Sequence, residues 1–231
     1  MRLHRFFTKE QLVEGATITL HDTPLAHQLR SVFRLRTGDS IILFDGSGFE
    51  YVSLIGKLQT DCVDVTIVEK QSTCFIPHKK IHLGMAIIKK DNFEWVLEKC
   101  TEIGVTCFTP LVSERTEKKN IDMTRAQKIV IEASEQSGRC AVPAVHDVTS
   151  FEDFLNKNKL PVFAFHGKGE VFDREKMIGH TEMCVLVGPE GGWSEKDIAL
   201  MKTSGVYVVS LGTQTLRAET AGVAISSLLL L

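Results

Sequence analysis

Short apolar runs alternate with segments of helical periodicity from residue 81 to the end of the chain. This alternation constrains the fold more than any other feature, because strands joined by helices pair in parallel and need helices on both faces of their sheet. The runs expected to form strands are residues 81–88, 107–112, 162–165 and 184–187. The segments expected to form helices are residues 93–103, ended by Gly104, and 123–137, ended by Gly138. We therefore predict an α/β domain.

The C-terminal end of the chain continues this pattern. Ser194 and Asp197 have the spacing of a capping box, which opens a helix that Gly205 closes. Residues 206–211 are expected to form the last strand, and a final helix is expected from about residue 217 to 231.

The first 70 residues have a different, mostly β texture. Thr23 is expected to cap a short helix with Pro24 in its first turn, and Gly38 to stop it. Residues 45–48, a glycine-rich turn between apolar runs, predict a β-hairpin. Around residues 70–80 the chain becomes polar, so we expect domains at 1–72 and 73–231.

Charge and composition exclude several classes of protein. The chain has 27 lysines and arginines against 29 aspartates and glutamates, so it does not coat nucleic acid by bulk electrostatics, although a local basic patch is compatible with that balance. No apolar run is long enough for a membrane span, and no signal-peptide pattern opens the chain. The six cysteines form no Cys-x-x-Cys pair, so no metal site or disulfide framework is indicated. We expect a cytoplasmic protein.

Two glycine-containing segments each follow an expected strand and precede an expected helix. In residues 188–192, Pro189 and three glycines allow a tight turn that a ligand can approach, although a plain strand-to-helix turn needs the same residues. In residues 211–222, Arg217 lies near a helix start, where a cation is disfavoured, so it suggests an anionic partner. Glu219 and Thr220 suit helix capping equally well.

These segments also carry a resemblance to a known family. The runs GPEGGWSEKD (residues 188–197) and LGTQTLRAETA (residues 211–221) resemble the SPOUT methyltransferases of the RsmE type, which methylate N3 of a uridine in 16S ribosomal RNA. Residues 27–39, 89–105 and 132–143 resemble further segments of that family in the same order, so the resemblance spans nearly the whole chain.

The resemblance implies a fold, a cofactor and partners. It implies an N-terminal PUA-like β-barrel domain that binds RNA and a C-terminal α/β methyltransferase domain with a deep trefoil knot around S-adenosylmethionine. It also implies a homodimer that acts on 16S ribosomal RNA of the small ribosomal subunit without a metal. Two alternatives stay open, namely methylation of a different RNA nucleotide and a non-catalytic role in ribosome assembly.

The resemblance also implies roles for individual residues. Arg217 is expected to stabilise charge on the uridine or to anchor a phosphate, and Glu219 to orient the loop or accept the N3 proton. The residues expected around the cofactor are Leu186, Gly188, Glu190, Gly191, Leu211, Gly212, Leu216 and Ala221. From the distribution of charge, the cations expected to follow the RNA are Arg2, Arg5, Arg30, Arg34, Arg36, Lys89, Lys90, Arg115, Lys118, Lys119 and Arg139. Glu135 and Gln136 either reach the target base or lie on a solvated helix face.

Overall fold

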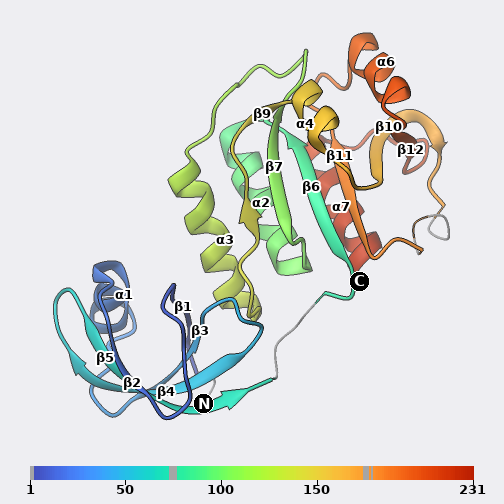
Figure 1. Ribbon diagram of the computed structural model, residues 1–231. Coiled ribbons are helices and arrows are strands. Elements are labelled where there is room, and N and C mark those ends of the chain that lie inside the picture. Colours follow the sequence, from blue (N-terminus) through green and yellow to red (C-terminus); the bar gives the residue numbers. More distant parts are fainter. Residues whose placement is uncertain (1–2, 73–76, 174–176, 178) are drawn as a thin grey trace. The chain divides into compact units, whose positions relative to one another are not determined.

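The computed structural model describes residues 3–72, 77–173, 177 and 179–231. The chain divides into two compact units (Figure 1). The first comprises Met1–Ile76 with Ser134–Val142, and the second comprises Pro77–Ala133 with Pro143–Leu231. The segment Ser134–Val142, which the expected domain limits assign to the second domain, thus groups with the first unit through its contacts.

The first unit is built on a five-stranded sheet. Its strand order is β1-β3-β4-β5-β2, and only the β1–β3 pair is parallel among the pairs of this sheet in the described chain. The strands are β1 (Arg5–Phe7), β2 (Thr17–Leu20), β3 (Ser40–Phe44), β4 (Glu50–Leu58) and β5 (Val63–Gln71). The hairpin expected at residues 45–48 is confirmed, because β3 and β4 pair antiparallel across that turn.

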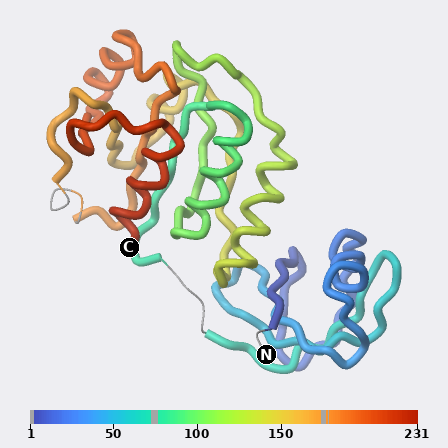
Figure 2. The backbone as a smooth tube through the Cα atoms, turned by 180° about the vertical axis from the view of Figure 1, so that it is seen from behind, coloured from blue at the N-terminus to red at the C-terminus, as the bar shows by residue number. Residues whose placement is uncertain are grey.

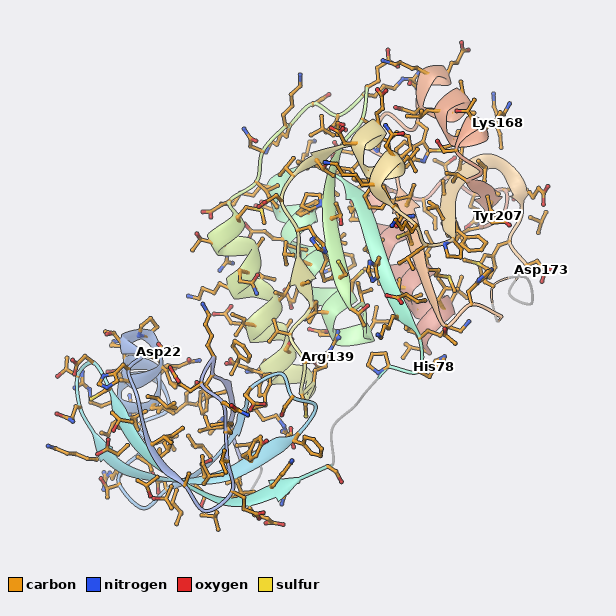
Figure 3. The ribbon with its side chains drawn as sticks, in the orientation of Figure 1. Asp22, His78, Arg139, Lys168, Asp173 and Tyr207 are labelled. Atoms are coloured by element: carbon orange, nitrogen blue, oxygen red, sulfur yellow. The ribbon has the colours of Figure 1, made fainter. Side chains whose placement is uncertain are left out.

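The helical segment of this unit differs in detail from the expectation. It consists of α1 (Thr23–His27) followed by the π-helical turn η1 (Gln28–Val32). Its N-cap is Asp22, labelled in Figure 3, whose Oδ1 accepts a hydrogen bond from the Leu25 amide at 2.9 Å. The expected cap at Thr23 is therefore wrong by one residue, because the Leu25 amide donates to the Asp22 carboxylate and not to the Thr23 hydroxyl.

The end of η1 also differs from the expected stop at Gly38. The chain leaves the helix at Arg34, which has a φ of 56° in the left-handed region that glycine usually occupies. The Leu35 amide donates to the Leu29 carbonyl at 2.9 Å, the bond that closes such a helix end. A bulky residue rarely adopts this backbone conformation, so a glycine-based rule could not find this end.

The second unit contains a mostly buried parallel sheet, as predicted. The strand order is β12-β10-β11-β6-β7-β8, with β9 pairing with β7, and all these pairs are parallel. The strands are β6 (Lys80–Ala86), β7 (Cys107–Val112), β8 (Ala144–Val145), β9 (Thr149–Ser150), β10 (Val162–Val171), β11 (Glu182–Val187) and β12 (Tyr207–Ser210).

Helices cover both faces of this sheet. They are α2 (Lys90–Ile103), α3 (Met123–Ser137), α4 (Phe151–Lys157), α6 (Glu195–Thr203) and α7 (Ala218–Leu230). Helices α2 and α7 lie side by side on one face, which is nearest the viewer in Figure 2. Helices α4 and α6 pack on the other face, where Phe151, Leu155 and Met201 belong to one buried apolar cluster.

The local signals at helix ends are confirmed where glycine or a capping box is involved. Gly104, Gly138 and Gly205 follow α2, α3 and α6 with positive φ angles of 124°, 75° and 69°. Ser194 and Asp197 exchange both hydrogen bonds of the capping box at the start of α6. These signals depend only on neighbouring residues, which is why the sequence reveals them.

The described cysteines are buried. Cys62, Cys100, Cys107 and Cys184 are free thiols in the interior, whereas Cys140 is disulfide-bonded, which the cysteine spacing did not indicate. Among the described residues, no helix is both long and apolar enough to cross a membrane.

Candidate functional site

The two turns follow β11 and β12, which lie on either side of β10 in the parallel sheet. Strands β11 and β12 flank β10 and run in the same direction, so the turns after Val187 and Ser210 lie at the same, carboxyl edge. In open α/β sheets this edge is where ligands bind. Both segments singled out in the sequence therefore lie at the same end of the sheet.

The turn after β11 is held by Trp193. The Gly192 amide donates to the Pro189 carbonyl at 2.8 Å, and Gly192 has a φ of 67°. The buried indole of Trp193 donates from Nε1 to the Phe165 carbonyl of β10 at 3.1 Å. A Cβ atom on Gly188 would lie 2.9 Å from the indole carbon Cε2. Gly188 is thus needed for close packing against Trp193.

Arg115 provides a second support for this turn. This exposed residue follows β7, and its Nη1 donates to the Gly191 carbonyl at 3.0 Å. The sequence placed Arg115 only among the cations that follow RNA, and nothing in its local pattern pointed to Gly191, which lies 76 residues away. Glu190, in the same turn, is exposed to solvent.

The turn after β12 is shaped by Ser210 and Gly212. Ser210 Oγ donates to the Gly212 carbonyl at 3.0 Å and accepts from the Gly212 amide at 3.3 Å. Gly212 has a φ of 127°, and no atom lies within 4 Å of the position that a Cβ would take. The space beside its main chain is therefore open, which is the geometry that a ligand bound by backbone groups requires.

The last residues of β10 and the residue that follows it pass close to β12. The Phe172 amide donates to the Ser210 carbonyl at 2.8 Å, and a Cβ atom on Gly169 would lie 2.5 Å from the main chain of Val209. Tyr207 of β12 stacks on Phe163 of β10 with ring centroids 5.0 Å apart; Tyr207 is labelled in Figure 3. The first two contacts hold the end of β10 against the end of β12 at the candidate site, whereas the stacked rings join the beginnings of the two strands.

Arg217 lies at the start of α7, as the sequence predicted. It is the N-cap residue with φ −64° and ψ 154°, its side chain makes no capping bond, and its carbonyl accepts from the Ala221 amide at 2.8 Å. The side chain is exposed and follows an exposed loop, residues 212–216. Glu219 lies half-buried in the first turn of the helix, where the helix dipole favours an anion.

Helix α7 is held in place by close packing on α2. A Cβ atom on Gly222 would lie 3.5 Å from Cγ1 of Val96, and the buried Ser226 hydroxyl lies 3.5 Å from the Cys100 sulfur. Burial raises the pKa of the Cys100 thiol to about 12, so this sulfur stays protonated. The rigid helix fixes the position of the main chain at Arg217.

The residues expected around S-adenosylmethionine fit a site made of main-chain groups. Leu186 and Gly188 are buried, and a Cβ atom on Gly84 would meet Leu186 Cδ2 at 2.5 Å, so that leucine side chain fills the core. Leu211 is half-buried, Gly212 is exposed beside open space, and Leu216 is exposed. Ala221 is half-buried on the first turn of α7.

Several of the cations expected to follow RNA are exposed. Arg30, Arg34 and Arg36 are exposed on or just after η1, and Lys89 is the exposed N-cap residue of α2. Arg2 lies outside the described residues. These positions leave the three arginines of the first unit available for phosphate contacts.

Arg5 and Arg139 do not fit the expected surface role. Arg5 Nε pairs with Glu50 Oε1 at 2.6 Å, and the Glu50 side chain is only 3% exposed. Arg139, labelled in Figure 3 beyond the end of α3, is 2% exposed, and burial lowers the pKa of its guanidinium to about 10. The Arg139 guanidinium is therefore buried, whereas the Arg5 side chain is 19% exposed and its guanidinium is paired with Glu50.

The described residues contain no cluster of three or more histidine, cysteine, aspartate or glutamate side chains arranged to hold a metal ion.

Comparison with known proteins identifies the family. Residues 76–230 match the family model described as an RNA methyltransferase domain. A protein of Rickettsia conorii named ribosomal RNA small subunit methyltransferase E is 30% identical over 230 residues, covering 96% of this chain and 93% of that protein. The chain belongs to the ribosomal RNA small subunit methyltransferase E family. A Synechocystis protein of the same name is 34% identical and covers 92% of this chain and 72% of its own length.

Solved structures of similar proteins extend this relationship to the fold. A Legionella pneumophila protein described as a putative methyltransferase with bound S-adenosylmethionine superposes with a TM-score of 0.91 at 28% identity, over 99% of this chain and 97% of its own. The family member from Neisseria gonorrhoeae bound to S-adenosylmethionine has a TM-score of 0.86 at 30% identity, over 98% and 96%.

Proposed function

We propose that this protein transfers the methyl group of S-adenosylmethionine to N3 of a uridine in 16S ribosomal RNA of the small ribosomal subunit. Membership of the methyltransferase E family supports the reaction class, and the names of the relatives support the RNA. The related structures with bound S-adenosylmethionine support the cofactor. The proposed substrate implies that the protein acts in the cytoplasm, where bacterial ribosomal subunits are assembled.

One observation from the site carries the proposal. The two glycine-bent turns lie at the carboxyl edge of a parallel sheet, and an exposed arginine follows the second turn at the start of α7. Main-chain groups of Leu186, Gly188 and Gly191 in one turn, and of Leu211 to Leu216 in the other, would hold the cofactor. S-adenosylmethionine supplies a methyl group on a positively charged sulfur, so the site needs no metal to activate it.

Arg217 and Glu219 are the residues that we assign to the reaction. When uridine N3 loses its proton, negative charge spreads to the ring oxygens, and the exposed guanidinium of Arg217 would stabilise that charge. The carboxylate of Glu219, two residues along the helix, would accept the proton or orient the loop that carries Arg217. N3 is occupied in a Watson–Crick pair, so the target uridine must be unpaired or flipped out.

We infer further that β10 to β12 form a deep trefoil knot. The close passage of Gly169 against Val209 and the bond between Phe172 and Ser210 support a chain that crosses tightly at this point. The five-stranded sheet of the first unit, with its exposed arginines, supports a PUA-like RNA-binding domain.

A homodimer is the remaining part of the proposal. Trp95 of α2 is 42% exposed, and at the C-terminal end Leu228 and Leu231 are 41% and 77% exposed. Helices α2 and α7 pack together, so these apolar side chains support a contact with a second copy through that face of the protein. Sedimentation equilibrium of the wild type and Trp95→Glu would test this contact, since a monomeric wild type would exclude it.

The test of the function is transfer of labelled methyl from S-adenosylmethionine to small ribosomal subunits that lack the modification, followed by mass spectrometry of the nucleosides. We expect 3-methyluridine to appear with wild-type protein. A different methylated nucleoside would support the alternative RNA methyltransferase. Absence of transfer despite measurable cofactor binding would support a non-catalytic role in assembly.

A further inference from the structure

The first unit contains a cavity that none of the roles above uses. It has a volume of about 210 Å³ and is lined by residues 3–6, by Gln28 and Phe33, and by Glu135 and Gln136 at the end of α3. All these residues belong to the first unit, and none belongs to the turns proposed to hold the cofactor. Sites for drug-sized ligands span about 300–1,000 Å³, so this cavity suits a smaller group such as one nucleobase.

One wall of the cavity is aromatic. The rings of His4 and Phe33 have centroids 4.2 Å apart, and Phe6 meets Phe33 edge-on at 5.3 Å. Phe6 is buried and holds Phe33 in place, whereas His4 is exposed and Phe33 is partly exposed. A flat ring that enters the cavity would therefore find an aromatic surface on which to stack.

The charged groups of the cavity are already engaged. Glu135 Oε1 accepts a hydrogen bond from the Phe7 amide at 2.9 Å, and Arg5 is paired with Glu50. A charged ligand group would have to compete with these partners. A neutral ring with polar edges does not meet this obstacle.

Two side-chain amides complete the cavity. Within the described residues, neither Gln28 nor Gln136 has a side-chain hydrogen bond. Each amide offers both a donor and an acceptor, which is the pair of groups that reads the edge of a nucleobase. The cavity thus combines a stacking surface with free groups for base-edge hydrogen bonds.

Cations for the RNA backbone follow directly in the chain. Arg34 comes immediately after Phe33 and is exposed, and its backbone adopts the left-handed conformation that a glycine would take more easily. Arg30 and Arg36 are exposed on the same segment. A strained arginine beside an aromatic cavity is consistent with one strand whose base enters the cavity and whose phosphates meet the arginines.

We propose that this cavity binds one unpaired base of the RNA substrate and thereby anchors the RNA on the first unit. The anchored base is distinct from the methylated uridine, because the cavity contains neither Arg217 nor Glu219 nor any residue assigned to the cofactor. This inference rests on the proposed function, since it takes ribosomal RNA as the ligand.

The experiment compares two RNA probes on the full-length protein by fluorescence anisotropy. One probe is a labelled single-stranded decamer of uridine or adenosine, and the other is an abasic decamer with the same number of phosphates. Wild type should bind the base-containing probe more tightly. Phe33→Ala should weaken that binding about 5- to 150-fold, the usual effect of losing one base stack, and should leave abasic binding unchanged.

Further variants separate recognition from folding. Because Phe33 also packs on the core of the first unit, His4→Ala and Gln136→Ala are tested in parallel, since both side chains are exposed. Each should reduce the preference for the base-containing probe. Val32→Ala is the matched control, because Val32 is 63% exposed on the same segment and does not line the cavity. Equal loss of both probes in all variants would overturn the proposal.

Methyl transfer to small ribosomal subunits distinguishes this inference from the proposed function. His4→Ala and Gln136→Ala should raise the KM for subunits and keep kcat near the wild-type value, because an anchor adds binding without touching the reacting atoms. A fall in kcat at saturating subunits would mean that the cavity holds the target uridine, and would overturn the anchor. A wild-type protein that transfers no methyl group would refute the proposed function. The decamer measurement would still report whether the cavity binds a base.

Discussion

Gly188→Ala tests how the candidate site is built. The added methyl carbon would lie 2.9 Å from Trp193 Cε2 and 3.1 Å from Cδ2 and Nε1. Carbon atoms in favourable contact are about 3.5–4.0 Å apart, so the indole must move by roughly half an ångström or more. Trp193 resists this movement because it is buried, bonded to the Phe165 carbonyl and packed on Phe151 at 4.8 Å between ring centroids.

The magnitude follows from these restraints. Inserting a methyl group into a well-packed site costs about 1–3 kcal/mol. We therefore expect Gly188→Ala to lower the free energy of unfolding by about 1–3 kcal/mol, measured by urea titration, with a lower affinity for S-adenosylmethionine measured by calorimetry. Gly167→Ala is the matched control, because a Cβ atom on Gly167 meets nothing within 4 Å and its φ is not positive. That variant should change stability by less than about 0.5 kcal/mol.

A double-mutant cycle identifies the source of the loss. If the clash with the indole is responsible, Gly188→Ala should cost about 0.5–2 kcal/mol less in a Trp193→Leu background, where the ring is gone. An unchanged cost in that background would refute the reasoning. So would a stability of Gly188→Ala equal to that of Gly167→Ala.

Four further predictions concern the reaction, the cofactor, the RNA and the buried thiols. Arg217→Ala should abolish methyl transfer and leave cofactor binding largely intact; wild-type-like turnover would remove the catalytic assignment. Gly212→Val should abolish cofactor binding by calorimetry, because a φ of 127° favours glycine and the valine side chain would fill the open space proposed for the cofactor. Arg34→Gly should keep the free energy of unfolding within about 1 kcal/mol, since glycine suits a left-handed helix end, yet reduce the salt dependence of RNA binding by about one unit of slope. Burial raises the pKa of Cys100 and Cys184 to about 12, above the value of 9.0 for an unfolded thiol. Both thiols should therefore resist alkylation in the native protein at pH 8. The free energy of unfolding should fall as pH rises above about 9, because the unfolded thiols then lose protons that the native thiols keep.

Sequence reasoning succeeded where the signal lies within a few residues. The alternation of apolar runs and helical patterns predicted the parallel sheet, because strands buried on both faces need continuous apolar residues. Gly104, Gly138 and the Ser194–Asp197 capping box predicted helix ends correctly. The motifs around Gly188 and Gly212 were expected to follow strands, and both turns do follow strands of the parallel sheet.

It failed where a side chain meets a distant partner. Arg5 and Arg139 read as surface cations, yet one is paired with Glu50, 45 residues away, and the other is buried. The sequence likewise contained no sign that Arg115 donates to the Gly191 carbonyl or that Trp193 packs on Gly188. A residue type states which interactions a side chain can make, and only the folded chain decides which partner is near enough to make them.

The sequence by itself therefore determined the α/β class, the helix ends marked by glycine or a capping box in the second unit, and the places of the two glycine-containing turns along the chain. The tertiary structure decided that Gly188 packs closely against the Trp193 indole and that Gly212 faces open space. It also decided that His4 and Phe33 line a cavity with Gln136. The division has one physical cause: caps, turns and periodicity are energies of neighbouring residues, whereas cavities, ion pairs and burial arise only when segments far apart in the chain are packed together.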